Sequence, residues 1–457
     1  MGSLSKFFNL TAALACVQCV SARGRVYQHA NAKFTMHNAQ PFAPASPLVV
    51  TENVLSLSTQ QVGQRARSSR ALHKLLPGGN APLIPTQYGV SYTVQIDFGG
   101  ELFSVIFDTG SSDLWLPSSD VECFDIDSNP VDSSECAFGP LYVGTYREGQ
   151  IADENMLISY GDGEWVVGTV GYEPVCLAGI NVDHQEVGLI HRAFWQGDNA
   201  TSGLLGFAYP SLTGAYNGTD ALNDSPATQL PYTNWFFSAI ERNLVNPMFS
   251  IAIQRGVSGG GGQLALGGLP DIAFTPDFAS TPLRILELTE NIVGVSNYTF
   301  YTIIPDSFIL RNDTNVHKRR FDWRSINRQS INATGVPVII DSGTTLMYLP
   351  EYLVDEVSAA FSPPATYIAA SGLYEVDCDS IPPYFAVVIG GLEIAIDPRD
   401  MILQNDLALD SSTGMCVIGL QSNGDSVLSI LGDSFLKNVV AVFDVGASEM
   451  RFATHLY

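Results

Sequence analysis

The sequence predicts an all-β protein made of two homologous lobes, and two observations support this prediction. First, short runs rich in β-branched and aromatic residues, such as 92–98 and 439–443, follow one another beyond residue 85, with glycine- and proline-rich turns between them. Second, residues 105–117 align without gaps on residues 338–350, as three apolar residues, an acid, a small hydroxyl residue, a glycine and two more hydroxyl residues. A repeat at this distance indicates two related structural units.

The first 22 residues are predicted to be a secretory signal peptide. Lys6 precedes an apolar run from 7 to 20, and the small residues Ser21 and Ala22 follow where a signal peptidase would cut. The run is too short and too interrupted by polar residues for a membrane anchor, which needs about 20 apolar residues. We therefore expect an exported protein without a membrane anchor, secreted to the extracellular space or, alternatively, kept in a vacuole. N-x-S/T triplets beyond the predicted signal peptide agree with export and predict a glycoprotein; they begin at Asn199, Asn217, Asn223, Asn297, Asn312 and Asn332, and Pro226 directly after the triplet at Asn223 disfavours that one.

A basic stretch, residues 23–85, separates the predicted signal from an acidic remainder. It holds seven Lys or Arg residues and a single acid, Glu52, whereas residues 86–457 hold 14 basic and 45 acidic residues. A charge break of this kind is typical of two functional units. The stretch is either a solvated linker or, as we expect, a pro-segment that is held electrostatically against an acidic protein as its own intramolecular inhibitor.

The repeat divides the remainder into an N-terminal lobe, 86–256, and a C-terminal lobe, 257–457. A second matching pair of segments supports this division, because Leu204-Leu205-Gly206 follows the first copy and Ile430-Leu431-Gly432 follows the second at a similar distance. Two homologous lobes explain both pairs.

Asp108 and Asp341 occupy equivalent positions in the two copies, each directly after an apolar triplet that is predicted to be a buried strand. Taken alone, either acid would more often be an ordinary turn residue than a catalytic one. A pseudo-twofold relation between the lobes would bring the two carboxylates together. Two carboxylates in contact cannot both ionise easily, so they share one proton and titrate as a unit. The duplicated pattern therefore favours catalysis.

Five cysteines follow the predicted signal peptide. Cys123 and Cys136, and likewise Cys378 and Cys416, are separated by short stretches that can form hairpins or loops, so we expect two disulfides in an exported protein. Cys176 has no obvious mate. We expect it to be a buried small apolar residue rather than a reactive thiol.

The motifs Asp108-Thr109-Gly110-Ser111-Ser112 and Asp341-Ser342-Gly343-Thr344-Thr345 resemble the two active-site signatures of the pepsin-like aspartic proteases. The resemblance covers nearly all of 86–457 and includes Tyr160-Gly161-Asp162-Gly163, the Leu-Leu-Gly-Phe-Ala-Tyr-Pro segment at 204–210, and Ile430-Leu431-Gly432-Asp433. It implies a bilobal pepsin-like fold with the active-site cleft between the lobes and a flap hairpin over the cleft.

The resemblance also implies a role for individual residues. Asp108 and Asp341 would bind the nucleophilic water, one as general base while the other protonates the substrate carbonyl. Thr109 and Ser342 would cross-link the two active-site loops, although threonine is more usual at the second position. The other implied residues orient the carboxylates (Ser111, Thr344) or belong to the flap and substrate-binding surface (Tyr160, Gly161, Asp162, Gly110, Gly343, Thr345, and Trp115, which supports the flap tyrosine).

The implied activity is hydrolysis of peptide bonds in polypeptides at acid pH by a monomeric endopeptidase, without a cofactor, metal or nucleic acid. One alternative is a catalytically inactive relative that binds or inhibits other proteins; it is disfavoured because Asp108, Asp341 and Tyr160 are all present. A second alternative is a glycosidase, whose two carboxyl groups need to lie about 5 Å or more apart rather than in contact.

Three features depart from the family pattern. Residues 311–334 form a long connection rich in Lys and Arg, which is either a tolerated surface insertion or a site of proteolytic nicking. Thr201-Ser202 replaces what is usually an apolar residue followed by an acid, and Glu164-Trp165 is a bulkier pair than usual after the flap tip. Asp162 at that tip could reach a lysine side chain just before the scissile bond, a trait that some fungal relatives show.

Overall fold

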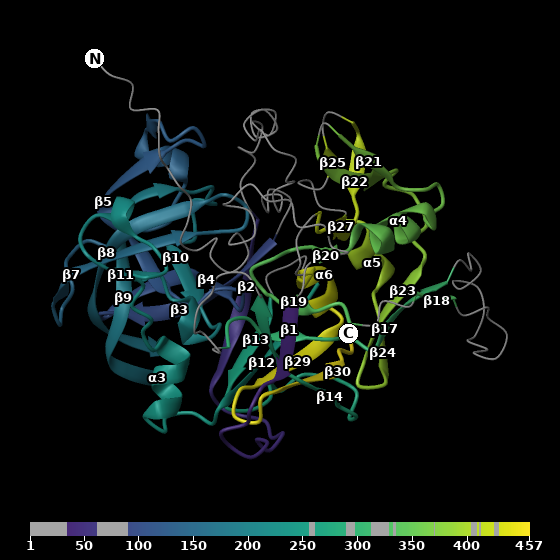
Figure 1. The fold of residues 1–457 in the computed structure, drawn as a ribbon, viewed down its shortest axis with the longest axis horizontal. Helices are drawn as coiled ribbons and strands as arrows, with labels where there is room; N and C mark the ends of the chain where they lie inside the picture. Colours follow the sequence, from purple (N-terminus) through teal and green to yellow (C-terminus); the bar gives the residue numbers. More distant parts are fainter. Residues whose placement is uncertain are drawn as a thin grey trace.

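The computed structural model describes residues 34–61, 90–255, 261–288, 298–311, 329–331, 335–369, 371–403, 409–410, 413–424 and 429–457. These residues form two lobes of β-structure with strands packed between them and only short helices (Figure 1). The expectation of an all-β, two-lobed protein is therefore confirmed. The predicted signal peptide and nearly all of the long connection 311–334 lie outside the described residues.

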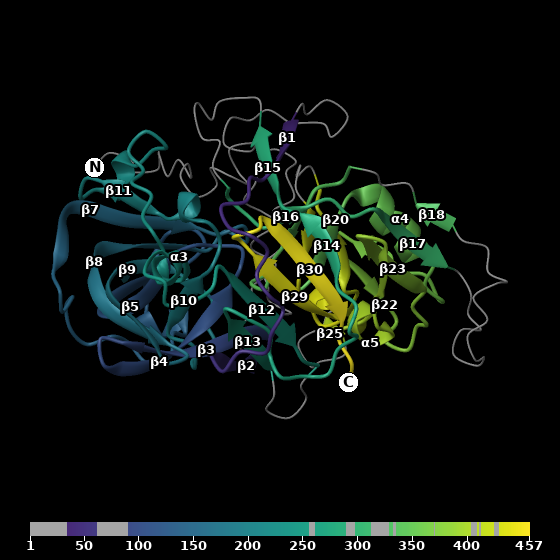
Figure 2. The ribbon, with the colours of Figure 1, turned by 90° about the horizontal axis from the view of Figure 1, so that it is seen from below.

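One sheet of 15 strands runs from the N-terminal lobe into the centre of the molecule. The strands that belong mainly to the N-terminal lobe are β11 (Ala215–Asn217), β7 (Gln150–Ser159), β8 (Trp165–Leu177), β9 (Ile180–Phe194), β5 (Leu114–Phe124), β10 (Gly203–Gly206), β4 (Glu101–Asp108) and β3 (Val90–Phe98), with β6 (Pro130–Val131) paired to β5. The order continues with β2 (Val54–Gln61), β13 (Gly262–Leu266), β12 (Met248–Ile253), β29 (Val439–Asp444), β30 (Glu449–Thr454) and β14 (Ala279–Pro282). Figure 2 shows β12, β13, β29 and β30 lying between the two lobes.

Three smaller sheets contain the remaining described strands. A seven-stranded sheet has the order β1 (Phe34–Asn38), β15 (Arg284–Leu288), β16 (Thr302–Ile303), β19 (Val338–Ile340), β28 (Ser429–Leu431), β20 (Met347–Leu349) and β27 (Leu420–Ser422). One four-stranded sheet has the order β18 (Gln329–Ile331), β17 (Ser307–Arg311), β23 (Tyr384–Ile389) and β24 (Leu392–Ala395). The other has the order β21 (Thr366–Ile368), β22 (Leu373–Val376), β26 (Met415–Val417) and β25 (Leu409–Asp410).

The internal repeat produces the same three-stranded arrangement in each lobe. In the N-terminal lobe, β10 runs parallel to β4, with Asp108 opposite Gly206, and antiparallel to β5. In the C-terminal lobe, β28 runs parallel to β19, with Ile340 opposite Leu431, and antiparallel to β20. The apolar triplets are buried except for Ile106, which is half-buried and lines the cavity described below, and each triplet carries its aspartate to the same end of an equivalent sheet.

Residues 34–61 form two strands of the fold, although the sequence analysis places them in the pro-segment. β1 pairs with β15, and β2 lies between β3 and β13. The segment between them is also anchored, since the Ser46 amide donates to Asp444 (2.7 Å), which is buried in an ion pair with Arg451. Among the described strands, β2 is the one that joins the N-terminal part of the large sheet to its central part.

The described helices are short. They are η2 (Ser133–Cys136), η3 (Pro210–Leu212), η4 (Ala221–Asn223), α3 (Trp235–Glu241), α4 (Glu351–Ala359), α5 (Pro398–Met401) and α6 (Asp433–Leu436). The spacing of Phe236, Ile240 and Leu244 predicts a helix capped by Thr233, but α3 is capped by Asn234, whose side chain accepts a hydrogen bond from the Phe237 amide. Asparagine caps at least as well as threonine, so the helix starts one residue later.

Both expected disulfides are confirmed. Cys123 is bonded to Cys136, which joins β5 to η2, and Cys378 is bonded to Cys416 in β26. Cys176 is a free thiol in β8 and is partly buried. Burial raises the pKa of the Cys176 thiol, which keeps it protonated and agrees with an unreactive side chain.

Candidate active site

Two equivalent turns meet at the boundary between the lobes, and each carries an aspartate. Asp108 ends β4, Asp341 follows β19, and both carboxyl groups are buried, with exposed fractions of 6% and 9%. The turns approach so closely that only glycine fits beside each aspartate. A Cβ atom on Gly110 would lie 2.6 Å from Asp341 Oδ1, and one on Gly343 would overlap Asp108 Oδ1.

Each carboxylate is held by the same pair of donors from its own turn. The Gly110 amide donates to Asp108 Oδ1 (2.7 Å), and the Ser111 hydroxyl donates to Asp108 Oδ2. In the other lobe the Gly343 amide donates to Asp341 Oδ1 (2.8 Å), and the Thr344 hydroxyl donates to Asp341 Oδ2 (2.6 Å). Because the donors are symmetric, both carboxyl groups are fixed in one orientation toward each other.

Thr109 and Ser342 cross-link the two turns beneath the aspartates. The Ser342 amide donates to Thr109 Oγ1 (2.9 Å), and the Thr109 amide donates to Ser342 Oγ (3.2 Å). Each hydroxyl also donates to a carbonyl oxygen of the opposite strand, Thr109 to Ile340 (3.1 Å) and Ser342 to Phe107 (3.1 Å). The serine therefore makes the same bonds as a threonine would, and the less usual residue does not open the junction.

The two aspartates form one titrating unit. Burial, followed by the charge of Asp341, raises the pKa of Asp108 well above its usual range, and the two carboxyl groups are in hydrogen-bonding contact. A pair in contact holds one shared proton over the acid range. The contact also excludes the glycosidase alternative, which needs space between its carboxyl groups.

The hairpin between β7 and β8 carries the flap residues. Its turn is closed by the Tyr160 amide donating to the Glu164 carbonyl (2.8 Å), with Gly161 exposed and Asp162 partly buried at the tip. The Trp115 indole donates to the Tyr160 hydroxyl (2.7 Å), as the resemblance implies. Trp195, which the sequence analysis did not identify, packs edge-on against Trp115 (5.1 Å between ring centroids) and Tyr160 (5.6 Å).

A cavity of about 90 Å³ lies between the flap and Asp108. Its lining comes from the dyad, the flap, the strands below and the loop after β9: Ser91, Ile106, Asp108, Tyr160, Asp162, Glu164, Trp195, Gln196, Gly197, Asp198, Thr201, Leu204 and Gly343. Of the predicted substrate-binding residues, Gly110, Gly161, Thr345 and Trp115 are not part of this lining. Thr345 is buried, and its carbonyl accepts a hydrogen bond from the Ser434 amide (2.9 Å).

Asp113, at the end of the first aspartate turn, is a buried acid outside the dyad. Its carboxylate accepts hydrogen bonds from the Gly214 amide (2.9 and 3.1 Å) and from the Tyr232 hydroxyl (2.7 Å), and 1% of the residue is exposed. Burial nevertheless raises the pKa of Asp113 from 3.8 to about 6. The folded protein therefore binds this proton more tightly than the unfolded chain does.

The free energy of unfolding is expected to fall as pH rises from about 4 to 6. The raised folded pKa of Asp113 contributes stability that is fully present below the unfolded pKa and is lost as pH rises through about 6. This loss amounts to about 3 kcal/mol, because one pKa unit corresponds to about 1.4 kcal/mol. Urea unfolding at a series of pH values measures it. Asp113→Asn, which cannot ionise there, should flatten the slope, and an unchanged slope would assign the effect to other acids.

Two lobes that each present one aspartate of a proton-sharing pair, under a hairpin flap, define an aspartic peptidase. The comparisons agree: residues 91–455 match the model of the family described as eukaryotic aspartyl protease. The chain is 38% identical over 450 residues to a probable aspartic-type endopeptidase of Aspergillus fumigatus, covering 96% of this chain and 97% of the relative. It is 25% identical to penicillopepsin-1 of Penicillium roqueforti, covering 98% of each chain.

The chain therefore belongs to the eukaryotic aspartyl protease family, and it is an aspartic-type endopeptidase. Its fold matches the crystal structure of the aspartic proteinase from Irpex lacteus with a TM-score of 0.56 at 18% identity, over 81% of this chain and 95% of that one. The expected bilobal pepsin-like fold is confirmed.

Proposed function

We propose that the protein is an exported endopeptidase that cleaves polypeptides in acid, with a water molecule activated between Asp108 and Asp341. The observation that carries this proposal is the contact between two buried carboxyl groups, each oriented by an amide and a hydroxyl of its own turn. One chain supplies both halves of the site, which supports action as a monomer. Among the described residues, no helix is long and apolar enough to cross a membrane.

The environment of the dyad suggests how the two aspartates divide the chemistry. Because burial and the charge of Asp341 raise the pKa of Asp108, the pair holds one proton between its two carboxyl groups in the free enzyme. The carboxylate that lacks the proton removes a proton from the water as the water oxygen attacks the peptide carbonyl carbon, and the other carboxyl group protonates the carbonyl oxygen. The flap, with Tyr160 held by Trp115, covers the site and excludes bulk water from the peptide.

Acid digestion of a denatured protein tests this function directly. The processed enzyme is expected to release internal peptides between pH 3 and 5, and a transition-state analogue of the statine type is expected to stop the reaction. Hydrolysis that persists in the presence of a saturating analogue, or that is absent throughout the acid range, would contradict the proposed function.

The basic stretch 23–85 is proposed to act as an intramolecular inhibitor at neutral pH. Its net charge is positive and therefore attracts the acidic remainder. Part of it, residues 34–61, is packed into the fold through β1 and β2. As pH falls toward about 4, carboxylates lose charge while Lys and Arg keep theirs, so the attraction weakens. Two features lie outside the described residues: Lys74, the candidate for contact with the dyad, and the alternative basic cleavage site Arg67-Ser-Ser-Arg70.

The precursor of the Asp108→Asn variant is expected to stay intact when it is incubated alone at pH 4. Acid release followed by self-cleavage needs a working dyad, so the inactive precursor should be trimmed only when active enzyme is added. Gel electrophoresis with N-terminal sequencing measures this. Processing of the inactive precursor by itself would contradict autocatalysis, and trimming that needs a basic-residue protease would assign maturation to a second enzyme.

A further inference from the structure

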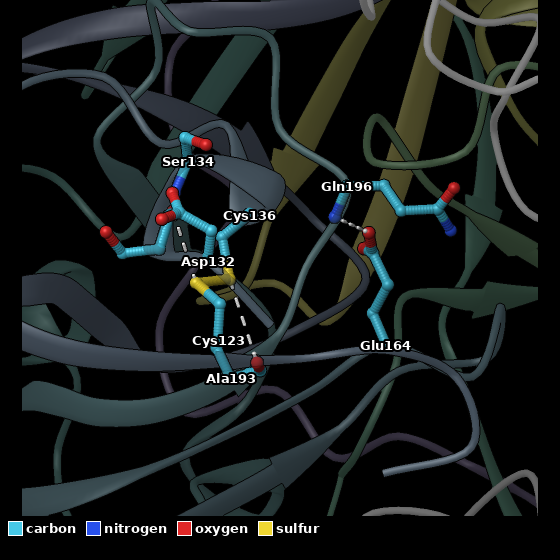
Figure 3. The surroundings of a disulfide bond; sticks show 8 residues. Cys123, Asp132, Ser134, Cys136, Glu164, Ala193 and Gln196 are labelled. Carbon is cyan, nitrogen blue, oxygen red and sulfur yellow. Dashed lines mark hydrogen bonds between the residues drawn. A yellow bond between two sulfur atoms is a disulfide. The ribbon is translucent and has the colours of Figure 1, made fainter. Parts of the chain in front are cut away.

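Glu164 is a buried acid of the flap that the catalytic mechanism does not use. It stands just before β8, and 8% of the residue is exposed. Its Oε1 accepts a hydrogen bond from the Gln196 amide (2.6 Å), which lies in the segment that follows β9 (Figure 3). The Glu164 side chain therefore joins the flap to a part of the N-terminal lobe outside the flap hairpin.

This hydrogen bond takes the place of strand pairing at the point where the flap leaves the sheet. The antiparallel pairing of β8 with β9 extends as far as Trp165 and Phe194. Two residues beyond Phe194, the Gln196 amide donates to a side chain of the flap instead of to a main-chain carbonyl of a strand. This link between the flap and the lobe is therefore one that a single substitution can remove.

The segment that receives Glu164 is itself held in place by the disulfide loop. The Gly197 amide donates to the Cys136 carbonyl (2.9 Å), and Cys136 is bonded to Cys123 in β5. Figure 3 shows Gln196 and Glu164 beside this disulfide. The Gln196 amide is therefore a fixed point to which a mobile hairpin can be attached.

The two ends of the flap turn are tied to two different elements. At its start, the Tyr160 hydroxyl accepts from the Trp115 indole of β5 (2.7 Å), and at its end Glu164 accepts from Gln196. The Tyr160 amide closes the turn by donating to the Glu164 carbonyl (2.8 Å). Between these two ties, the turn faces the cavity that also contains Asp108.

Contact with Asp162 allows Glu164 to keep its hydrogen bond in acid. The two carboxyl groups are in hydrogen-bonding contact, and the Glu164 amide donates to Asp162 Oδ1 (3.0 Å). Burial and the charge of Asp162 raise the pKa of Glu164 well above its usual range, so the pair shares a proton at acid pH instead of repelling. A carboxyl group in such a pair still has an oxygen that accepts from the Gln196 amide.

We propose that Glu164 is a positioning residue, which holds the flap over the dyad by anchoring it to the main chain at Gln196. The proposal rests on the proposed function and adds to it a residue that acts through the flap rather than on the reacting atoms. An anchored flap already has the conformation that covers the peptide. A flap without the anchor has this conformation for only part of the time, which weakens the apparent affinity for substrate by that fraction.

Steady-state kinetics at pH 4 on a peptide without Lys, Arg or His test the anchor. Glu164→Ala removes the acceptor and is expected to raise KM about ten-fold, with a much smaller change in kcat. Glu164→Gln keeps an oxygen for the Gln196 amide and should recover most of this loss. Glu122→Ala removes an exposed acid from β5 and is the matched control for net charge, so its KM should equal that of the unsubstituted enzyme.

Hydrogen exchange, measured by mass spectrometry on the free enzyme, follows the anchor without relying on catalysis. Peptides that span 160–164 should exchange faster in Glu164→Ala than in the unsubstituted protein, because the turn opens more often. Glu164→Gln and Glu122→Ala should exchange like the unsubstituted protein. Exchange in β9 should be the same in all variants, which separates a released flap from a misfolded lobe.

A KM or a flap exchange that is unchanged in Glu164→Ala would overturn the proposal. If KM rises while exchange stays the same, Glu164 acts on the substrate directly and not through the flap. A Glu164→Gln variant that behaves like Glu164→Ala would overturn the proposal as well, because the charge and not the anchor would then matter. Failure of the unsubstituted enzyme to cleave the peptide would instead count against the proposed function, and hydrogen exchange would still decide the role of Glu164.

Discussion

Replacing either Asp108 or Asp341 by asparagine is expected to abolish peptide hydrolysis and to leave the fold intact. Each substitution keeps the volume of the side chain and one oxygen that accepts from the amide of the turn, and the new NH2 group can donate to the hydroxyl oxygen of Ser111 or Thr344. It removes the shared proton, and with it either the general base or the general acid. Such groups contribute about 10²- to 10⁴-fold each, so kcat should fall at least 100-fold.

The measurement needs a readout of folding beside the assay, because a misfolded variant would also be inactive. Circular dichroism and the urea midpoint at pH 4 should be close to those of the unsubstituted protein. The precursor is best activated in trans for both variants, so that failed maturation is not mistaken for failed catalysis. A variant that keeps more than about a hundredth of the activity would contradict the assignment of the dyad.

Gly343→Ala is expected to reduce kcat about 100-fold by moving the aspartates apart. The added methyl group would overlap Asp108 Oδ1, and neither turn can yield easily because Thr109 and Ser342 cross-link them. A displacement of about 1 Å at reacting groups is enough for a 100-fold loss. The effect should appear in kcat more than in KM, since the methyl group overlaps the reacting carboxyl group and the rest of the cavity lining is unchanged.

The control for this variant is Gly391→Ala. Gly391 has a φ of 80°, and a Cβ atom there meets nothing within 4 Å, so alanine costs backbone strain without touching the site. It should lower stability and leave kcat close to that of the unsubstituted enzyme. If Gly343→Ala behaves in the same way, the close contact between the turns is not required for activity.

The dyad could be predicted from the sequence because its information is local and duplicated. An apolar triplet followed by an acid, a hydroxyl residue and a glycine specifies a strand and a tight turn, and the second copy indicates that two such turns meet. The disulfides were predictable for a similar reason, because each pair closes a short stretch. The start of α3 was placed one residue early, since Thr233 and Asn234 are both good caps and only the tertiary structure chooses between them.

The rest of the candidate site could not be predicted because it depends on contacts between distant segments. Trp195 is an ordinary aromatic residue in the sequence, and its position against Tyr160 results from the pairing of β8 with β9. The contact of Glu164 with Gln196 is set by the same pairing. The two strands within 34–61 could not be predicted for two other reasons. The basic charge of the whole stretch indicated a separable unit, and the strands that pair with β1 and β2 lie mostly far along the chain.

The position of β2 also determines how the protein can reach its folded state. This strand comes early in the chain, yet it pairs with β13 far downstream and with β3 at the edge of the N-terminal lobe. Closing such a long loop is slow because it costs conformational entropy, which strand pairing offsets only once both partner strands are present. Residues 54–61 therefore act as a template on which the lobes are joined. A chain that loses this template after folding keeps two strand edges without their original partner. The persistence of such a trimmed chain would depend on a slow unfolding rate rather than on an equilibrium, so reversible unfolding in urea would have to be measured on the chain that retains residues 54–61.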